Sequence, residues 1–314
     1  MPTNAERPMP TSTLYRSNTR LAGFHLALQA NQLFLLPLFL LPFDPRWGWL
    51  LLPGVLLTNA WWAFIHEAIH GVMFEDRRTN RLAGRVNAVL YGAPFDLLRW
   101  GHLLHHAHSR TERERSEVYV AGRDNRLIAT LGYYFRLLGG LYLVELLGGL
   151  LVLLPRKMAC RVVDRIASPC NVVGELAERL LSAETLRDAR LEALAIILVH
   201  AAAFALYGEH AWMLVLAVAG RGLLISLVDN AFHYATPLDD IRYARNLELP
   251  AALSRLILHF NLHGAHHLRS RVPWQQLPEW HRQSGNGYQG GWFATVFRQL
   301  RGPIAAQRLP RGAS

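Results

Sequence analysis

Residues 211–233 read AWMLVLAVAGRGLLISLVDNAFH, an apolar run with a single charge before it ends in Asp229, Asn230 and His233. A helix needs about 20 apolar residues to cross the hydrocarbon core of a bilayer, and this run is long enough if its ends extend slightly past the core. Polar side chains at a membrane boundary are costly unless they serve a site. The stretch therefore predicts a membrane span that leads into a functional site.

Three similar runs lie elsewhere in the chain, at 21–43, 48–66 and 191–208. The first two are separated by the turn Asp44-Pro45-Arg46, and the third is followed closely by 211–229, so the four runs form two pairs. Hydrophobic residues make up 51% of the chain and charged residues only 18%. The expected fold is an all-α integral membrane protein with about four transmembrane helices in two hairpins and a cytoplasmic helical cap.

The positive charge of the chain agrees with membrane topology. The formal net charge is +10, but the arginines lie mostly between the apolar runs and form no single basic domain, which argues against a nucleic-acid partner. Because cytoplasmic loops of membrane proteins are enriched in basic residues, the arginine-rich connection after 48–66 is expected in the cytoplasm. In a bacterium this membrane is the cell inner membrane. These arginines are Arg77, Arg78, Arg81, Arg85, Arg99, Arg110, Arg113 and Arg115.

Eight of the fifteen histidines fall in three clusters, HEAIH at 66–70, HLLHH at 102–106 and HGAHH at 263–267. Residues three and four apart lie on one face of a helix, so each cluster can direct its imidazoles at one point. Eight imidazoles without a thiolate exceed what one zinc ion uses, which indicates two metal ions, and iron is the choice that suits oxygen chemistry. The clustered histidines are His66, His70, His102, His105, His106, His263, His266 and His267.

Further ligating and supporting residues are expected close to these clusters. His233, which follows the last span, is predicted to be a ninth ligand. Asn230 and Asp229 are predicted to orient ligands or to contact a metal through water, since polar groups at that depth need a role. Glu67 is a third supporting candidate because it lies inside the first cluster.

The apolar run 131–154 affects the topology. It contains Arg136, Glu145 and two Gly-Gly pairs. If it crossed the membrane once, the histidine clusters would lie on opposite sides. We therefore expect it to be interfacial or re-entrant, with all clusters on the cytoplasmic side.

The clusters and their order resemble the membrane fatty acid desaturase and hydroxylase superfamily, which includes carotenoid ketolases. The resemblance runs from about Trp61 to His281 and includes Pro94-Phe95 before the second cluster and Pro273-Trp274 after the third. It implies a di-iron centre held by the eight clustered histidines and His233, with O2 as co-substrate. The expected reaction is the introduction of a double bond into an acyl chain, with hydroxylation or ketolation as the alternative.

The resemblance also implies partners. The substrate is lipid-like, an acyl-lipid or an acyl-carrier thioester, and the aromatic side chains of Trp61, Trp62, Phe64 and Phe232 are candidates to line its tunnel. The chain has two cysteines and no thiolate cluster, so an external electron donor is expected: a ferredoxin, rubredoxin or cytochrome with its reductase. The expected organisation is a polar segment at 1–20, a membrane-embedded domain at 21–300 and a polar, loosely ordered tail at 301–314.

Two functions from other classes fit parts of the sequence. HEAIH at 66–70 matches HExxH, the pattern of zinc metalloproteases in which Glu is the general base, but a protease leaves six clustered histidines unexplained. A metal transporter is the other alternative. Transporters place their ligands near the membrane midplane, whereas these clusters lie at the ends of spans and in the connections between them.

Overall fold

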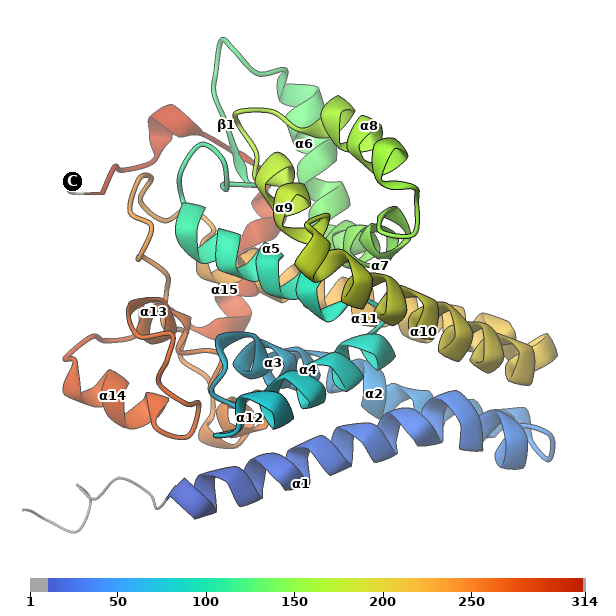
Figure 1. The fold of residues 1–314 in the computed structure, drawn as a ribbon. Coiled ribbons are helices and arrows are strands. Elements are labelled where there is room, and N and C mark those ends of the chain that lie inside the picture. The colour runs from blue at the N-terminus through green and yellow to red at the C-terminus, as the bar shows by residue number, and fades with distance from the viewer. Residues whose placement is uncertain (1–10, 313–314) are drawn as a thin grey trace, which may run out of the picture.

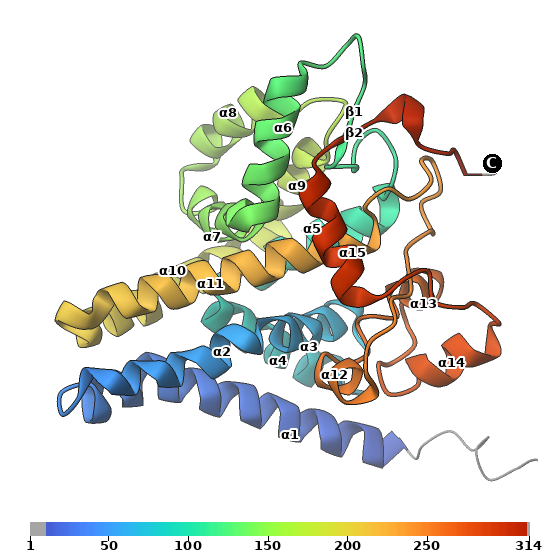
Figure 2. The ribbon, with the colours of Figure 1, turned by 180° about the vertical axis from the view of Figure 1, so that it is seen from behind.

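The computed structural model describes residues 11–312, so residues 1–10 and 313–314 of the predicted polar end segments lie outside the described part. The chain is mostly helical, which confirms the predicted class (Figure 1). The long helices α1, α10 and α11 run alongside one another and, with the short helix α2, project from one side of the molecule, while α12 to α15 lie at the other side (Figures 1 and 2). The histidine clusters lie on shorter elements away from the projecting ends.

The N-terminal helices form the first part of the projecting layer. Helix α1 begins at Thr11, ten residues before the predicted start of the first span, and continues into a π-helix. The turn at Asp44 is fixed by its side chain, which accepts a hydrogen bond from the Arg46 amide at 2.9 Å. The elements are α1 (Thr11–Ala30), η1 (Asn31–Leu40), η2 (Pro45–Leu51), α2 (Leu52–Leu56) and α3 (Thr58–His70).

The second part of the layer is formed by α10 (Ala183–Tyr207) and α11 (Ala211–Asp229). Between them η4 (Gly208–His210) reverses the chain, and Gly208 has φ 51° and ψ −121°, a conformation that favours glycine. Ala203 and Tyr207 pack in one cluster with Leu214 of α11. Helix α11 ends in the short helix η5 (Asn230–Phe232).

By length and composition, three helical runs within residues 11–312 could cross a membrane. A fourth is possible if two helices bent by 43° form one span. The chain reverses inside the run that contains α10 and α11, so that run is a pair of helices. The three runs are Tyr15–Leu40, Arg126–Leu151 and Ala183–Phe232, and the bent pair is Pro45–Leu56 with Thr58–His70.

The predicted interfacial or re-entrant segment is a broken helix. It consists of α6 (Arg126–Phe135), η3 (Arg136–Gly140) and α7 (Leu141–Leu151), with non-helical backbone at Leu138 and Gly139. Gly139 has φ 119°, which lets the chain turn there. Figure 2 shows α6 running across α11 rather than along it. Because this run is also long and apolar enough to span, its interfacial placement stays a prediction.

The remaining helices surround the histidine clusters. Helices α8 and α9 are amphipathic, and Ala159 and Val163 of α8 pack against Ala177 of α9. The helices are α4 (Arg77–Tyr91), α5 (Phe95–His108), α8 (Arg156–Ile166), α9 (Val173–Leu180), α12 (Ala251–Leu256), α13 (His263–Leu268), α14 (Leu277–Gln283) and α15 (Trp292–Arg298), with short turns η6 (Gln299–Arg301) and η7 (Ala306–Arg308).

The C-terminal tail is ordered over its described residues, so the expectation of a loose tail was wrong. Strand β2 (Ile304–Ala305) pairs in parallel with β1 (Val118–Tyr119), and the Ile304 amide donates to the Glu117 carbonyl at 2.7 Å. Because the two strands are far apart in the sequence, no local pattern in the polar tail predicts that they pair. The tail closes over the loop that follows the second histidine cluster.

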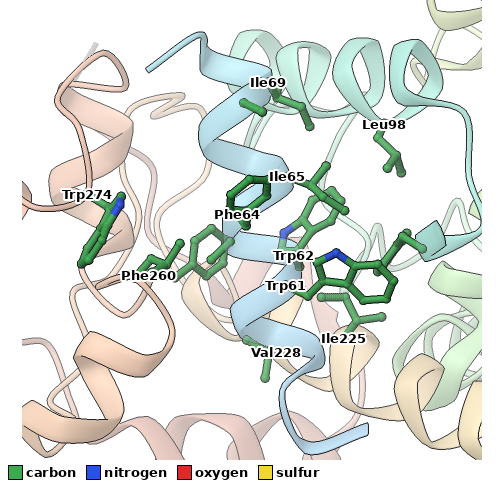
Figure 3. Close-up of a cluster of buried hydrophobic side chains, with 14 of the residues drawn as sticks. Trp61, Trp62, Phe64, Ile65, Ile69, Leu98, Ile225, Val228, Phe260 and Trp274 are labelled. Atoms are coloured by element: carbon green, nitrogen blue, oxygen red, sulfur yellow. The ribbon is translucent and has the colours of Figure 1, made fainter. Parts of the chain in front are cut away.

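The main core lies around α3. Trp61, Phe64 and Ile65 are buried between neighbouring elements and meet Ile225 and Val228 of α11 (Figure 3). Burying such side chains contributes about 1.5–3 kcal/mol each. This packing holds the end of α3, which carries the first histidine cluster, in a fixed position.

Candidate metal centre

The last turn of α3 positions His66 and His70. They are four residues apart and therefore project from the same face. Gly71 ends the helix directly after His70 with φ 76°, in the left-handed conformation typical of a helix C-terminus. Asn80 then fixes the turn, since its amide donates to the Ala68 carbonyl at 2.8 Å and its oxygen accepts from the Met73 amide at 3.1 Å.

The other clusters are held on two more helices. The last turns of α5 carry the second cluster, and the six-residue helix α13 carries the third. Asn246 fixes α13 by accepting a hydrogen bond from the Ala265 amide at 2.8 Å. His233 directly follows η5, so the end of α11 reaches the same place.

All nine predicted ligands come together in two neighbouring groups. Within each group, one possible ligand atom per histidine lies within 4.8 Å of the others. No other set of three or more metal-binding side chains occurs among residues 11–312. The first group is His66, His70, His102, His106 and His266, and the second is His105, His233, His263 and His267.

The ring nitrogens converge at distances suited to coordination. Nε2 of His102 lies 2.9 Å from Nε2 of His70 and 3.0 Å from Nε2 of His106. In the second group, Nε2 of His267 lies 3.1 Å from Nε2 of His263 and 3.3 Å from Nε2 of His105. Ligands about 2.1 Å from one ion are separated by roughly 3 Å at right angles and somewhat more in a tetrahedron. Both groups therefore have the spacing of a metal coordination sphere.

The protonation of these rings also suits a metal. Burial lowers the pKa of His106, and burial together with neighbouring histidines lowers the pKa of His102, His263 and His266 well below the usual value. Neutral imidazole is the form that binds metals. Both ring nitrogens of His66 and Nε2 of His233 are buried without a hydrogen-bond partner among the described residues. An ion coordinated by the converging nitrogens satisfies such atoms.

Glu114 supports the second group, and the sequence analysis missed it. Its Oε2 lies 3.2 Å from Nδ1 of His105, which leaves Nε2 of that ring for the centre. Burial raises the pKa of the Glu114 carboxyl, but His105 more than offsets this and the pKa falls to about 2. Burial lowers the pKa of His105, and Glu114 raises it overall. The only sequence signal was an acidic residue soon after the second cluster.

The three predicted supporting residues lie beside the centre. Oε2 of Glu67 accepts from the Trp274 amide at 3.0 Å, and its Oε1 lies 3.8 Å from Nδ1 of His66. Oδ1 of Asn230 accepts from the Ser116 hydroxyl at 3.4 Å. Nδ2 of Asn230 is buried without a partner among residues 11–312. Asp229 lies 3.4 Å from Arg136 and faces the adjoining cavity.

A cavity of about 600 Å³ adjoins the centre and reaches His102 and His105. Its size falls in the range of about 300–1,000 Å³ that is typical of ligand sites. One part of its wall is apolar and another is charged. The apolar lining residues are Trp62, Leu97, Leu98, Val118, Leu141, Val144, Val172, Val173 and Leu176, and the charged ones are Glu112, Arg113, Glu114, Arg115, Arg123, Asp124, Arg136, Glu145 and Asp229.

The cavity differs from the predicted aromatic tunnel. Of the four aromatic candidates only Trp62 lines it. Trp61 and Phe64 are buried in the main core, and Phe232 stacks on His263 with ring centroids 4.4 Å apart. The aliphatic wall comes instead mainly from α5, α7 and α9, and no local sequence pattern indicates that these helices meet.

The sequence model of the fatty acid desaturase family matches residues 45–296, which is most of the chain and includes all nine histidines. The chain belongs to the fatty acid desaturase family. No curated protein and no solved structure matches it. Membership in the desaturase family implies oxidoreductase activity, and with the apolar helices it indicates an integral membrane protein.

Proposed function

We propose that this chain is a membrane di-iron oxidase that uses O2 to introduce a double bond into an acyl chain. The observation that carries the proposal is the pair of histidine groups directly beside a cavity with an aliphatic wall. Nine histidines are proposed as ligands, five for one iron and four for the other. The desaturase family model supports this assignment.

Two irons of this kind supply, when reduced and exposed to O2, the oxidising power to remove hydrogen from an unactivated C–H bond. The chain's own residues position the substrate and the ligands. Leu98 and Trp62 place an apolar chain beside His102, and the remaining aliphatic wall extends away from the centre. Glu114 holds the His105 ring in one orientation. Loss of a second hydrogen from the adjacent carbon gives an alkene.

Hydroxylation is the second candidate, because the same centre and cavity serve both reactions. The outcome depends on how the substrate's neighbouring carbon is held after the first hydrogen is lost. A closely packed aliphatic wall that holds two adjacent carbons at the centre favours desaturation.

The zinc protease alternative receives no support from the geometry of HEAIH. A protease needs the Glu carboxylate directed at a metal-bound water. Here the Glu67 carboxylate is buried and bound to the Trp274 amide, while His66 and His70 join three histidines from other clusters. Zinc sites use about four ligands, and this centre offers nine.

The proposal includes a location and partners. The histidine groups are proposed to lie on the cytoplasmic side of the membrane, which is the inner membrane if the cell is bacterial. An acyl-lipid or acyl-carrier thioester is the proposed substrate. The electrons are proposed to come from an external ferredoxin, rubredoxin or cytochrome with its reductase.

Expression in a host whose lipids are known tests the function. Mass spectrometry of total acyl chains is expected to show a new unsaturated species that is lost in His105→Ala. A His108→Ala variant is the matched control, since His108 is on the same helix but bonds Glu175 and Arg113 and belongs to neither group. A hydroxylated product in place of the alkene would favour the second candidate. Unchanged lipids with iron-loaded protein and a reducing partner would overturn both.

A further inference from the structure

A line of oxidisable aromatic side chains leads away from the candidate metal centre. The ring of Trp62 lies 6.4 Å from the ring of His102, and the ring of Tyr91 lies 5.9 Å from Trp62. The Tyr91 ring is in turn 5.5 Å from Trp61 and 4.9 Å from Tyr142. These are centroid distances between rings in contact, so an electron can pass between neighbouring side chains.

Tyr91 is placed to lose a proton together with an electron. Its hydroxyl donates to Oε2 of Glu145 at 3.3 Å. Burial and the Glu145 carboxylate raise the pKa of Tyr91, so the side chain is a neutral phenol. Oxidation of a phenol is much easier when a base accepts the proton. Burial raises the pKa of the Glu145 carboxyl to about 8, so the base is its ionised form, which predominates above that pH. Glu145 also lines the cavity, together with Arg136 and Asp229.

The charged and polar groups around the aromatic side chains favour Tyr91 as the side chain that is oxidised. Arg221 lies over the Trp61 ring, 5.4 Å from its centroid, and a positive charge there opposes removal of an electron from Trp61. The Trp61 indole also donates to Asn87 at 3.0 Å, and an amide oxygen is a poor proton acceptor. Tyr142 donates to the Tyr91 carbonyl at 2.5 Å and so has no carboxylate partner for its hydroxyl hydrogen.

We propose that Trp62, Tyr91 and Glu145 form a relay that discharges the metal centre when it has been oxidised by O2 without a substrate in the cavity. With iron bound by the histidines, Tyr91 would give the oxidised centre one electron through Trp62, and a second cycle, after the external donor has restored the tyrosine, would give the second electron that a two-electron oxidant requires. The phenolic proton moves to Oε2 of Glu145, leaving a neutral tyrosyl radical and a carboxylic acid. The external one-electron donor restores the tyrosine, and Glu145 returns the proton. The inference rests on the proposed di-iron function.

The relay answers a chemical need of such a site. An oxidant strong enough to attack a C–H bond also attacks the side chains around it if no substrate is present. The ligand rings and the aliphatic wall are the nearest targets. A short path to a tyrosine with its own base removes the oxidant before it damages them.

Electron paramagnetic resonance of the intact protein tests the relay. Iron-loaded protein in detergent is reduced chemically, exposed to O2 without lipid substrate and frozen rapidly. We expect an organic radical signal that narrows when the protein contains ring-deuterated tyrosine. The signal is expected to be lost in Tyr91→Phe, to be weaker in Glu145→Gln and to remain in the control Tyr142→Phe. A signal that survives in Tyr91→Phe, or is lost in Tyr142→Phe alone, overturns the proposal.

Optical measurement of iron oxidation in the same samples separates the two proposals. If the iron is not oxidised by O2, the proposed function fails and the relay with it. If the iron is oxidised but no tyrosyl radical forms, the relay alone fails. Should Tyr91→Phe not retain iron, peptide mass spectrometry of the wild-type protein after repeated substrate-free turnover decides. Oxidation concentrated at Trp62 and Tyr91 supports the relay, and oxidation confined to the histidines and the cavity wall overturns it.

Discussion

Oε2 of Glu114 lies 3.2 Å from Nδ1 of His105, although Glu114 belongs to an irregular loop and His105 to α5. A carboxylate on the outer nitrogen of a metal-ligating histidine fixes the ring and strengthens it as a ligand. Arg110 holds the loop in place, since its amide donates to the Glu114 carbonyl at 2.9 Å and its guanidinium pairs with the buried Glu117 at 2.6 Å. The metal centre therefore depends on residues outside the three histidine clusters.

The first prediction concerns this contact. Glu114→Gln keeps the size of the side chain but removes its charge, and we expect metal affinity to fall by about 10–100-fold. Glu112→Gln is the control, since Glu112 is on the same loop and pairs with Arg123 instead of a histidine. Metal retention against a series of chelator concentrations measures the change. Equal retention in the two variants would contradict a role for Glu114.

The second prediction separates the two histidine groups. His233→Ala removes one of four ligands from the second group and none from the first, so we expect one metal ion to be lost and the other retained. His108→Ala is expected to keep both ions. Metal content per chain after desalting is the measurement, and loss of both ions from His233→Ala would show that the groups do not act separately.

The third prediction is the pH dependence of the metal-free protein. Burial lowers the pKa of His106, and burial with neighbouring histidines lowers the pKa of His263, His266 and His267. Unfolded histidines bind protons below about pH 6.5 while these stay neutral in the fold, so the unfolded state is favoured as the pH falls. We expect the thermal midpoint to drop between about pH 7 and pH 5. In the metal-loaded protein the drop should begin at lower pH, because bound metal stabilises the folded state. A midpoint that is constant or rises on acidification would contradict this.

The fourth prediction concerns the packing of the third cluster. A Cβ at Gly264 would collide with the Ala244 carbonyl oxygen and press on the Asn246 side chain that fixes α13. Gly264→Ala is expected to destabilise the protein by about 1–3 kcal/mol and to lower metal content. Gly132→Ala is the control, because nothing lies within 4 Å of its added Cβ and an alanine favours helix α6. Thermal midpoints of the two variants in the same detergent give the comparison.

The fifth prediction tests the cavity as the substrate site. Leu141 lines the cavity, while Leu143, two residues further along α7, is exposed and does not line it. Leu141→Trp is expected to lower product formation by up to about 100-fold without loss of metal, because it displaces the acyl chain from the centre. Leu143→Trp should retain most of the activity. Similar activity in the two variants would place the substrate elsewhere.

The spacing of the histidines along the sequence predicted much of the candidate site. In each cluster the two residues four apart enter the same group, as in the pairs His66–His70, His102–His106 and His263–His267. This follows from one helix turn. The middle histidine of the second cluster, His105, joins the second group, and the middle histidine of the third cluster, His266, joins the first group. This exchange depends on how α3, α5 and α13 meet, so local spacing does not predict it.

Features that depend on distant packing were missed for the same reason. Glu114 reaches His105 only because Arg110 folds the loop back. The tail was expected to be loose, yet Ile304 pairs with Val118 across most of the sequence. The break at Gly139 was signalled by its Gly-Gly pair, but the direction of the chain after it was not.

The most direct test of the account is the metal content of the detergent-purified protein, measured with the acyl-chain profile of its host. The account predicts two irons per chain and a new unsaturated acyl species. In His105→Ala it predicts loss of the unsaturated species and a lower iron content per chain. One zinc per chain with unchanged lipids would contradict it and would favour the interpretation of HEAIH at 66–70 as a zinc protease motif.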